Sequence, residues 1–196
     1  MGLEKDPDGT ILSEEEKEGL LLPGILTRKQ LDEHEQKNIE DALVWLISRP
    51  PDPAKILTES FIKLLHKHMY GKTWKWAGTF RKSDKNIGIK WSTISLELRK
   101  LLDDTLYWIE NKVYPPEEIA IRFKHRLVSI HCFPNGNGRH SRLMADIMME
   151  RIFKLPRFVW SGNDLQDTSQ LRKDYITALR KADEGDMDEL ISFAKT

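Results

Sequence analysis

The sequence is short of cysteine, of long apolar runs and of net charge. Its 196 residues include one cysteine, Cys132, which excludes a disulfide within the chain and a cysteine-rich zinc site. No apolar run approaches membrane-spanning length, and the first residues lack the apolar core of a secretory signal. These absences favour a cytoplasmic protein without a membrane partner.

Charge is balanced overall but uneven along the chain. The 31 basic and 31 acidic residues cancel, so the composition gives no reason to expect direct nucleic-acid binding. Residues 1–41 nevertheless hold twelve acidic and five basic side chains, whereas residues 63–90 hold eight basic side chains and one acidic, Asp84. The two segments either meet inside the fold, serve different partners or form two solvated faces.

Apolar residues recur mostly at helical spacing, which predicts an all-α fold. Residues 1–26 form a preamble with a short helix from Ser13 and a leucine run that we expect to pack on the main domain, residues 27–196. Predicted helices occupy residues 27–48, 54–69, 92–112, 115–130, 168–182 and 186–194, and one more follows the turn at 134–138. Residues 70–90 lack a helical period, and there we predict a loop with a small β-hairpin.

The stretch from His131 to Arg142 combines a base, a turn and two arginines. The turn Pro134–Gly138 is rich in Asn and Gly, which tolerate positive φ. Backbone N–H groups of such a turn at a helix start bind anions, and Arg139 and Arg142 share a face near that positive end. This predicts a phosphate site beside His131. The structural alternative is an ordinary turn, with His131 capping a helix and Arg142 pairing with Asp146.

Three other motifs carry less weight. The tripeptide Gly71-Lys72-Thr73 matches the end of a Walker loop, but His66 stands where that loop requires Gly and no strand precedes it. His66 and His68 are two residues apart with no cysteine or carboxylate at ligand spacing, so we expect exposed side chains rather than a metal site. Cys132 adjoins His131, but adjacent side chains rarely converge, and we expect a buried structural cysteine.

The pattern His131-x-Phe133-x-Asn135-Gly136-Asn137-Gly138-Arg139-x-x-Arg142 resembles the Fic family signature, His-x-Phe-x-Asp/Glu-Gly-Asn-Gly-Arg-x-x-Arg, and differs only at the acidic position. Upstream, Trp76-Ala77-Gly78-Thr79-Phe80-Arg81 resembles the segment that precedes the Fic flap hairpin. The resemblance covers residues 35–185. The chain length, Glu18-Gly19-Leu20 and the turn at 134–138 further resemble the Fic subfamily called mobile mystery protein B.

This resemblance implies a Fic-type helical bundle that transfers AMP from ATP to a Ser, Thr or Tyr hydroxyl of a target protein. It implies that His131 is the general base and that Phe133 points inward and fixes the loop. The implied phosphate-binding residues are Gly136, Asn137 and Gly138 for the α- and β-phosphates, Arg139 for the β-phosphate or the loop, and Arg142 for the γ-phosphate. The Asn137 side chain is expected to take part.

Asn135 stands where the family pattern has a carboxylate that holds Mg²⁺. An amide offers one neutral oxygen, so it should hold a hard dication less well. We expect nucleotidyl transfer that is retained but sensitive to the metal, Mg²⁺ or Mn²⁺. Slow catalysis and an altered reaction are the alternatives.

The resemblance also implies a target-docking flap and a means of inhibition. The flap residues, which would bind a target by strand pairing, are Lys82, Ser83, Asp84, Lys85, Asn86, Ile87 and Gly88. Many Fic proteins are inhibited by a Ser/Thr-x-x-x-Glu-Gly/Asn helix whose Glu pairs with the second arginine. Here one extra residue separates Ser13 from Glu18, so a Glu18–Arg142 pair is one hypothesis and a solvated acidic tail is the other.

Two other functions stay open. One is a Fic-type transferase that moves UMP or a phosphoryl group, although the loop lacks the Lys of the kinase variant. The other is a non-catalytic, nucleotide-binding regulator of a toxin-type system, which Asn135 would suit. The subfamily resemblance implies a mobile-element setting and a helix-turn-helix regulator encoded nearby.

Overall fold

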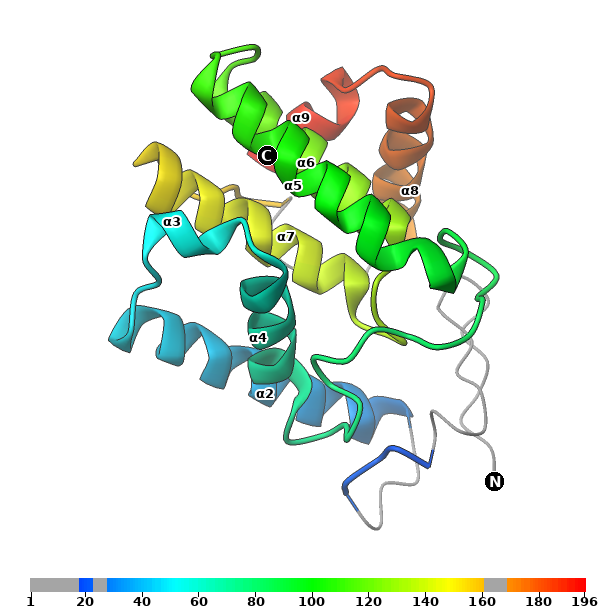
Figure 1. Cartoon of the computed structure of the whole chain (residues 1–196). Helices are drawn as coiled ribbons and strands as arrows, with labels where there is room; N and C mark the ends of the chain where they lie inside the picture. Colours follow the sequence, from blue (N-terminus) through cyan, green and yellow to red (C-terminus); the bar gives the residue numbers. More distant parts are fainter. Residues whose placement is uncertain (1–17, 23–27, 161–168) are drawn as a thin grey trace.

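The computed structural model describes residues 18–22, 28–160 and 169–196, and these residues form an all-α fold (Figure 1). Their helices are α2 (Arg28–Ser48), α3 (Pro53–Ile56), α4 (Glu59–Tyr70), η1 (Trp91–Thr93), α5 (Ile94–Glu110), α6 (Pro116–Ile130), α7 (Asn137–Ile147), the π-helix η2 (Met148–Phe153), α8 (Ser169–Asp183) and α9 (Asp188–Lys195). In these three stretches, no helix combines the length and the apolar character needed to cross a membrane.

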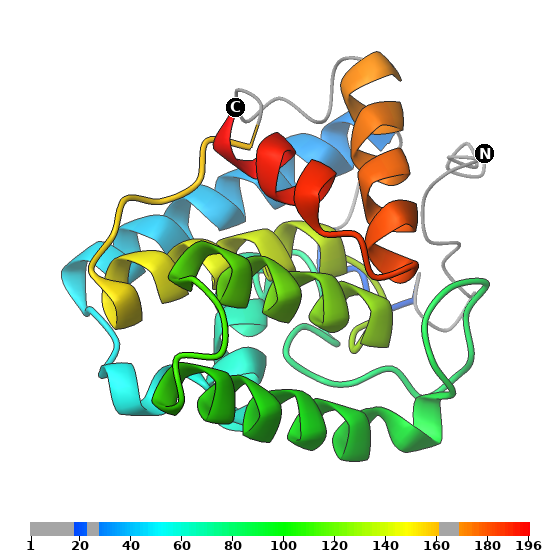
Figure 2. The ribbon, with the colours of Figure 1, turned by 90° about the horizontal axis from the view of Figure 1, so that it is seen from above.

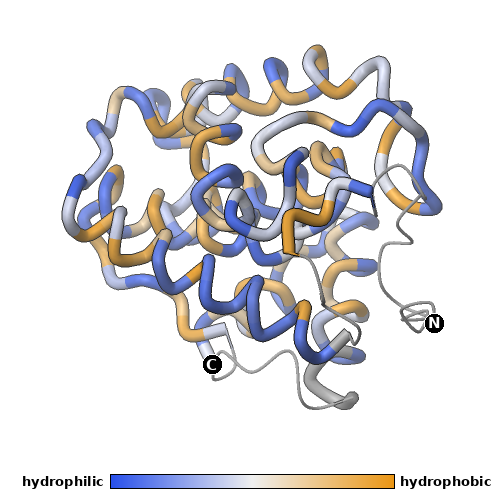
Figure 3. Tube along the Cα trace, turned by 90° about the horizontal axis from the view of Figure 1, so that it is seen from below, coloured by the Kyte–Doolittle hydropathy of each residue, from blue (hydrophilic) through white to orange (hydrophobic). Residues whose placement is uncertain are grey.

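Helices α6 and α7 form the centre of the fold. They pack against each other, with α5 beside α6 and with α4 and α2 on the other side of α7 (Figure 1). Helices α8 and α9 pack together as a pair against this centre, as the view from above shows (Figure 2). Hydrophobic and hydrophilic residues alternate along the helices (Figure 3), and the large buried side chains include Phe123 and Phe133. The centre of the bundle therefore holds the turn between α6 and α7 in a fixed place.

The predicted helix 54–69 is divided in two. Leu57 leaves the helical conformation, with φ −87° and ψ 58°, and ends α3. Thr58 then caps α4, because its side chain accepts a hydrogen bond from the N–H of Phe61 at 3.2 Å. The break was not predicted because the apolar spacing continues across it. The capping threonine is the sequence feature that marks it.

The buried face of α2 is more polar than its apolar stripe predicted. Ile47, which belongs to the apolar stripe of this helix together with Leu31, Ile39, Leu43 and Leu46, is 66% exposed. Glu35 and Asn38 are buried instead, with exposed fractions of 0% and 3%. Both have partners in the segment after α4: Glu35 accepts from the Trp74 indole, and Asn38 donates to the Thr73 hydroxyl. Buried polar groups of this kind are tolerated because they are hydrogen-bonded.

The predicted β-hairpin is absent, because residues 71–90 are a loop without strands. The described chain contains one isolated bridge, between Leu20 and Trp74. Around it the N–H of Leu21 donates to the Thr73 carbonyl, and the N–H of Lys75 donates to the Gly19 carbonyl, both at 2.8 Å. Residues 18–22 of the preamble thus pair with this loop, while the helix predicted from Ser13 lies outside the described residues.

Candidate active site

The candidate site lies where α6 ends and α7 begins. His131 caps α6 in the left-handed conformation, with φ 55° and ψ 61°, which is uncommon for a residue with a Cβ. Its N–H donates to the Leu127 carbonyl at 3.3 Å, and only 5% of the residue is exposed. The chain therefore turns sharply at His131, and the histidine is embedded in the protein rather than placed on a free loop.

Asn137 closes the turn between the two helices. Its Oδ1 accepts from the N–H of Phe133 at 2.9 Å, and its Nδ2 donates to the Phe133 carbonyl at 2.8 Å. Both atoms of the amide are therefore engaged inside the loop. Phosphate binding by the Asn137 side chain stays a prediction, and in the structure this side chain fixes the loop.

The backbone at the start of α7 has the form expected of an anion site. Gly136 has φ 78°, and a Cβ there would lie 2.5 Å from Cζ of Tyr70, so the position requires glycine. The N–H groups of Asn137, Gly138 and Arg139 belong to the first helical turn and have no acceptor within the helix. With the helix dipole they favour an anion in front of α7.

A substitution at Gly138 tests phosphate binding separately from folding. A Cβ at this position would meet no atom within 4 Å. We expect Gly138→Ala to raise the free energy of unfolding by about 0.5–1 kcal/mol, because Ala is the better helix former. The added methyl group would occupy the space in front of the first turn, so affinity for ATP should fall about tenfold or more. Urea denaturation and calorimetric titration with ATP measure the two effects, and an unchanged affinity would exclude this helix start as the phosphate site.

His66 and Phe133 support the loop from behind. The prediction that His66 is exposed was wrong: it is fully buried, and its Nδ1 accepts from the N–H of Gly78 at 3.0 Å. The proton therefore resides on Nε2, which donates to the Asn135 carbonyl at 3.1 Å. Phe133 stacks on the His66 ring with centroids 3.7 Å apart. His66 thus ties the motif loop to the segment that leads into the flap, a role that its position next to a helical stripe did not reveal.

Buried histidines make stability depend on pH. Burial lowers the pKa of His140 from 6.5 to about 4, and burial followed by the charge of His140 lowers the pKa of His66 well below 6.5. The unfolded chain binds more protons than the folded chain between those values, so stability is lost as the pH falls from 6.5 toward 4. Asp146 opposes this, because burial raises its pKa to about 6.

We therefore expect His140→Gln to flatten the loss of stability in acid. The wild type should lose up to about 1.4 kcal/mol per pH unit for His140 alone below its unfolded pKa, and the variant should lack that component. Urea denaturation at pH 7 and pH 5 gives both slopes. Equal slopes for the two proteins would contradict a neutral, buried His140.

Arg139 forms an ion pair inside the protein. Its guanidinium pairs with the fully buried carboxylate of Glu35 and lies 5.3 Å from the centroid of the Tyr70 ring. Glu35 also accepts from the indole N–H of Trp74 at 2.6 Å. Breaking a buried pair by removing one partner costs about 3–5 kcal/mol. Of the two roles predicted for Arg139, the geometry supports holding the loop.

Arg142 has no comparable partner. Its guanidinium lies 5.6 Å from the centroid of the Tyr175 ring on α8. The carboxylate of Asp146 is engaged by the indole N–H of Trp160 at 2.9 Å instead, and Glu18 is exposed. Within the described stretches neither acid forms an ion pair with Arg142, so the alternative Arg142–Asp146 pair and the hypothetical Glu18–Arg142 pair are both absent.

The residues around Asn135 do not fit a protein-built Mg²⁺ site. The Asn135 Oδ1 already accepts from the N–H of Gly136 at 2.7 Å. In the described part of the chain, no three His, Cys, Asp or Glu side chains are grouped as metal ligands. Mg²⁺ normally binds one or two carboxylates together with substrate phosphates, and this loop supplies no carboxylate.

Arg81 shapes the flap. Its side chain is fully buried, and its Nε donates to the His131 carbonyl at 2.6 Å. Its two terminal nitrogens reach both ends of the flap: Nη1 donates to the Ser83 carbonyl at 2.8 Å, and Nη2 donates to the Ile89 carbonyl. One guanidinium therefore joins the flap to the C-terminal end of α6. The sequence pattern included Arg81 without a role, although cations are favoured at the last carbonyls of a helix.

The flap lies directly against His131. Gly88 has φ 93°, and a Cβ there would lie 2.5 Å from Cβ of His131. Most of the predicted docking residues are exposed, namely Lys82, Ser83, Asp84, Asn86, Ile87 and Gly88, whereas Lys85 is half-buried. Any segment bound along the flap would therefore run close to the histidine.

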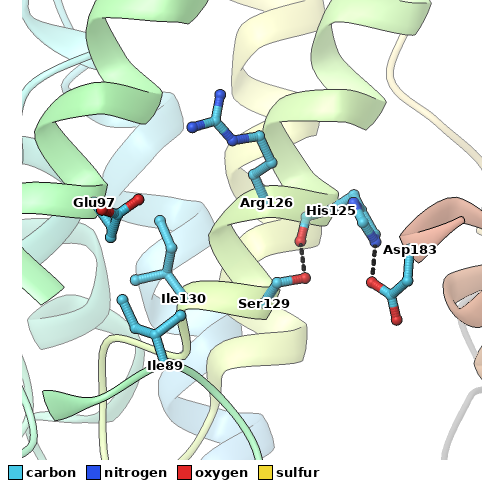
Figure 4. Close-up of a pocket in the computed structure, with 7 residues that line it drawn as sticks. All are labelled: Ile89, Glu97, His125, Arg126, Ser129, Ile130 and Asp183. Carbon is cyan, nitrogen blue, oxygen red and sulfur yellow. Dashed lines mark hydrogen bonds and ion pairs between the residues drawn. The ribbon is translucent and has the colours of Figure 1, made fainter. Parts of the chain in front are cut away.

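A pocket of about 220 Å³ lies near the flap but is distinct from the candidate site. Figure 4 shows its lining residues, which are Ile89, Glu97, His125, Arg126, Ser129, Ile130 and Asp183. The His125 Nε2 is bonded to Asp183 at 2.8 Å, and the Ser129 hydroxyl donates to the His125 carbonyl at 2.9 Å. None of the predicted site residues lines this pocket.

The weaker motifs are accounted for by structure. Cys132 is buried as predicted, and burial raises the pKa of its thiol to about 12, which excludes a ready thiolate. Lys72 of the Walker-like tripeptide pairs with Asp41 on α2 at 2.6 Å. His68 stacks on Trp45 with centroids 3.8 Å apart and joins no metal cluster of described residues.

The described residues form an all-α bundle whose central turn carries the buried His131 directly before the start of α7. Residues 56–149 match the model of the Fic/DOC family, and the chain contains a Fic/DOC family domain. It is 25% identical over 170 residues to "Protein adenylyltransferase Fic" of Aedes aegypti, covering 84% of this chain and 32% of the relative. The relative of the same name from Nematostella vectensis is 26% identical over 167 residues, covering 83% and 37%.

Solved structures share the fold. Fic-1 from C. elegans superposes with a TM-score of 0.68 at 20% identity, covering 91% of this chain and 51% of that one. The BepC protein of Bartonella tribocorum, solved with bound AMPPNP, has a TM-score of 0.66 at 16% identity and covers 93% and 97%. The all-α prediction is thereby confirmed. The chain spans about a third of the length of the curated relatives it matches.

Proposed function

We propose that this chain is a protein adenylyltransferase that transfers AMP from ATP to a Ser, Thr or Tyr hydroxyl of a target protein. The observation that carries the proposal is the closed turn that places His131 beside the backbone N–H groups at the start of α7. The names of the curated relatives and the AMPPNP in the BepC structure support ATP as the substrate.

In this proposal His131 is the general base. Its imidazole takes the proton of the target hydroxyl while the hydroxyl oxygen attacks the α-phosphorus, and the bond to the bridging oxygen of the β-phosphate breaks to release pyrophosphate. Asn137 and Gly138 supply backbone N–H groups to the phosphates, and Arg142 supplies positive charge. Gly136, whose N–H donates to Asn135 at 2.7 Å, contributes the tight turn in front of them. Arg139 keeps the start of α7 in place through Glu35.

The flap binds the target protein in the same proposal. Arg81 fixes the two ends of the flap, and the mostly exposed residues between them, 84–88, pair with an extended segment of the target. We further propose that the protein is cytoplasmic, belongs to the mobile mystery protein B subfamily and acts with a helix-turn-helix regulator encoded nearby. No membrane or direct nucleic-acid partner belongs to this proposal.

Asn135 provides a test of metal use. If Mg²⁺ or Mn²⁺ enters with the phosphates of ATP, the loop adds at most one neutral oxygen to its coordination. We expect Asn135→Asp to lower the Mg²⁺ concentration for half-maximal transfer about tenfold, because a carboxylate replaces the amide. Transfer rates over a Mg²⁺ titration measure this, with Asn86→Asp as a control that adds the same charge in the flap. A midpoint that Asn135→Asp leaves unchanged would exclude metal contact at this position.

Labelled ATP distinguishes the proposal from its alternatives. Lysate is incubated with the protein and ATP labelled at either the α- or the γ-phosphate, with Mg²⁺ or Mn²⁺. Transfer of the α label alone supports AMP transfer, and transfer of the γ label shows a kinase. Label transfer from α-labelled UTP shows the UMP-transferring alternative. Nucleotide binding without transfer supports the non-catalytic regulator, which the absence of a carboxylate at Asn135 favours.

A further inference from the structure

Lys124 is an anomaly in the centre of the bundle. It lies in the middle of α6, it is fully buried, and its Nζ has no hydrogen-bond partner among the residues that the structure describes. The amine lies over two aromatic rings, 4.3 Å from the centroid of Tyr175 and 5.9 Å from that of Trp160. Lysine is almost never fully buried unless it is paired.

The aromatic rings do not compensate for the burial of this amine. A desolvated cation–π contact contributes about 2 kcal/mol, whereas burying an ammonium group costs several kcal/mol. Burial, and then the charge of Arg142, lower the pKa of Lys124 well below its usual value, which favours the neutral amine. A neutral amine without a hydrogen bond still costs about 1–3 kcal/mol. In either form the group lacks the partner that would stabilise it.

The surroundings of Lys124 are positively charged and lead to the phosphate loop. Arg142, from the second turn of α7, approaches the same Tyr175 ring, at 5.6 Å from its centroid. The Tyr175 hydroxyl is likewise buried; the charge of Arg142 and a hydrogen bond from its guanidinium act on this hydroxyl, and no carboxylate of the described stretches accepts from it. The nearby carboxylate of Asp146 is engaged by the Trp160 indole at 2.9 and 3.1 Å. The amine of Lys124, the guanidinium of Arg142 and the hydroxyl of Tyr175 therefore gather without a carboxylate bonded to any of them in the described stretches.

We propose that Lys124 is a second cationic ligand, together with Arg142, of the terminal phosphates of the bound nucleotide. The inference rests on the nucleotide of the proposed function but not on AMP transfer. A multiply charged phosphate chain suits the site because it pairs with both cations and accepts from the tyrosine hydroxyl. The lysine stem is flexible, so the unbonded amine can move from the Tyr175 face toward a ligand at the start of α7.

Calorimetry with three probes tests the inference: inorganic tripolyphosphate, ATP and AMP. In Lys124→Met the Kd values for tripolyphosphate and ATP should rise about tenfold or more, whereas the Kd for AMP should change less than about twofold. Lys55→Met, at an exposed lysine of α3, is the matched control and should bind all three probes as the wild type does. Unchanged Kd values for ATP and tripolyphosphate in Lys124→Met overturn the inference, and so does an equal loss for AMP.

Two further measurements keep the inference testable if Lys124→Met fails to fold. Lys124→Gln keeps a polar side chain but removes the charge, and it should show the same selective loss. In the wild type, addition of tripolyphosphate should shift the ¹³Cε resonance of one lysine from the neutral to the protonated position. A wild type in which no lysine resonance shifts, or which binds no tripolyphosphate, overturns the proposal.

The failure of this inference differs from failure of the proposed function. If the wild type does not transfer AMP but binds tripolyphosphate through Lys124, the function fails and the site stands. If AMP is transferred and binding does not depend on Lys124, the site fails alone.

Discussion

His131→Asn is expected to abolish AMP transfer while leaving ATP bound. General-base catalysis contributes about 10²–10⁴-fold, and an amide side chain does not accept the hydroxyl proton. Asn is the preferred replacement because residue 131 has φ 55°, a conformation that Asn tolerates better than Ala does. Transfer from α-labelled ATP should therefore fall at least about 100-fold, whereas the Kd for ATP should stay within about threefold of the wild type.

The control for this prediction is His34→Asn, at an exposed histidine of α2. It should transfer AMP at the wild-type rate, because it removes an imidazole without touching the loop. Near-normal transfer by His131→Asn would mean that another group is the base. A loss of ATP binding in His131→Asn would mean that the variant has disturbed the loop rather than the chemistry.

Arg81→Lys should reduce AMP transfer about 100-fold, since misplacement of a reacting group by 1 Å has an effect of that size. The guanidinium donates to the carbonyls of His131, Ser83 and Ile89 at once, and it also approaches the Ile130 carbonyl at 3.4 Å. A lysine ammonium keeps the charge but cannot span these separated acceptors. Each lost charge-assisted bond costs about 1.5–3 kcal/mol, so the free energy of unfolding should drop by about 3 kcal/mol.

Hydrogen exchange locates the effect of this substitution. Amides of residues 82–90 should exchange faster in Arg81→Lys, whereas those of α4 and α5 should follow the global loss of stability. Arg99→Met, at an exposed position of α5, removes an arginine without a structural role and should change neither exchange nor transfer. If Arg81→Lys kept full transfer, the flap would not depend on this side chain for its position.

The motif and most helices could be predicted from sequence because they depend on local order. Pro116 marks the start of α6, the turn at 134–138 marks the start of α7, and both helices lie where expected. The break between α3 and α4 was missed because the apolar spacing runs through it, and Thr58 was not recognised as a cap. The hairpin prediction was wrong because the glycines at 71, 78 and 88 allow turns but do not specify pairing.

Contacts between side chains distant in sequence are the main feature of the site that the sequence did not predict. Glu35 lies on the face of α2 that also carries the buried Leu31 and Ala42, but its partner Arg139 is 104 residues away. His66 and Asn135 are 69 residues apart. Such contacts follow from the packing of α2 and α4 against α7, and no local pattern encodes them. For the same reason the isolated position of Arg142 was not foreseen.

The way Arg81 holds the flap has a consequence for the evolution of target choice. Four of its acceptors are main-chain carbonyls, and every residue type supplies such a carbonyl. Asp84 adds a side chain to that arrangement, because its carboxylate lies 3.7 Å from Nη1 of Arg81 and accepts from the N–H of Trp91 at 2.7 Å, whereas the side chains of Asn86 and Ile87 are exposed. The loop can therefore accumulate substitutions while His131 beside it keeps its position. A library randomised at residues 86 and 87 should retain AMP transfer and differ in the proteins that it modifies.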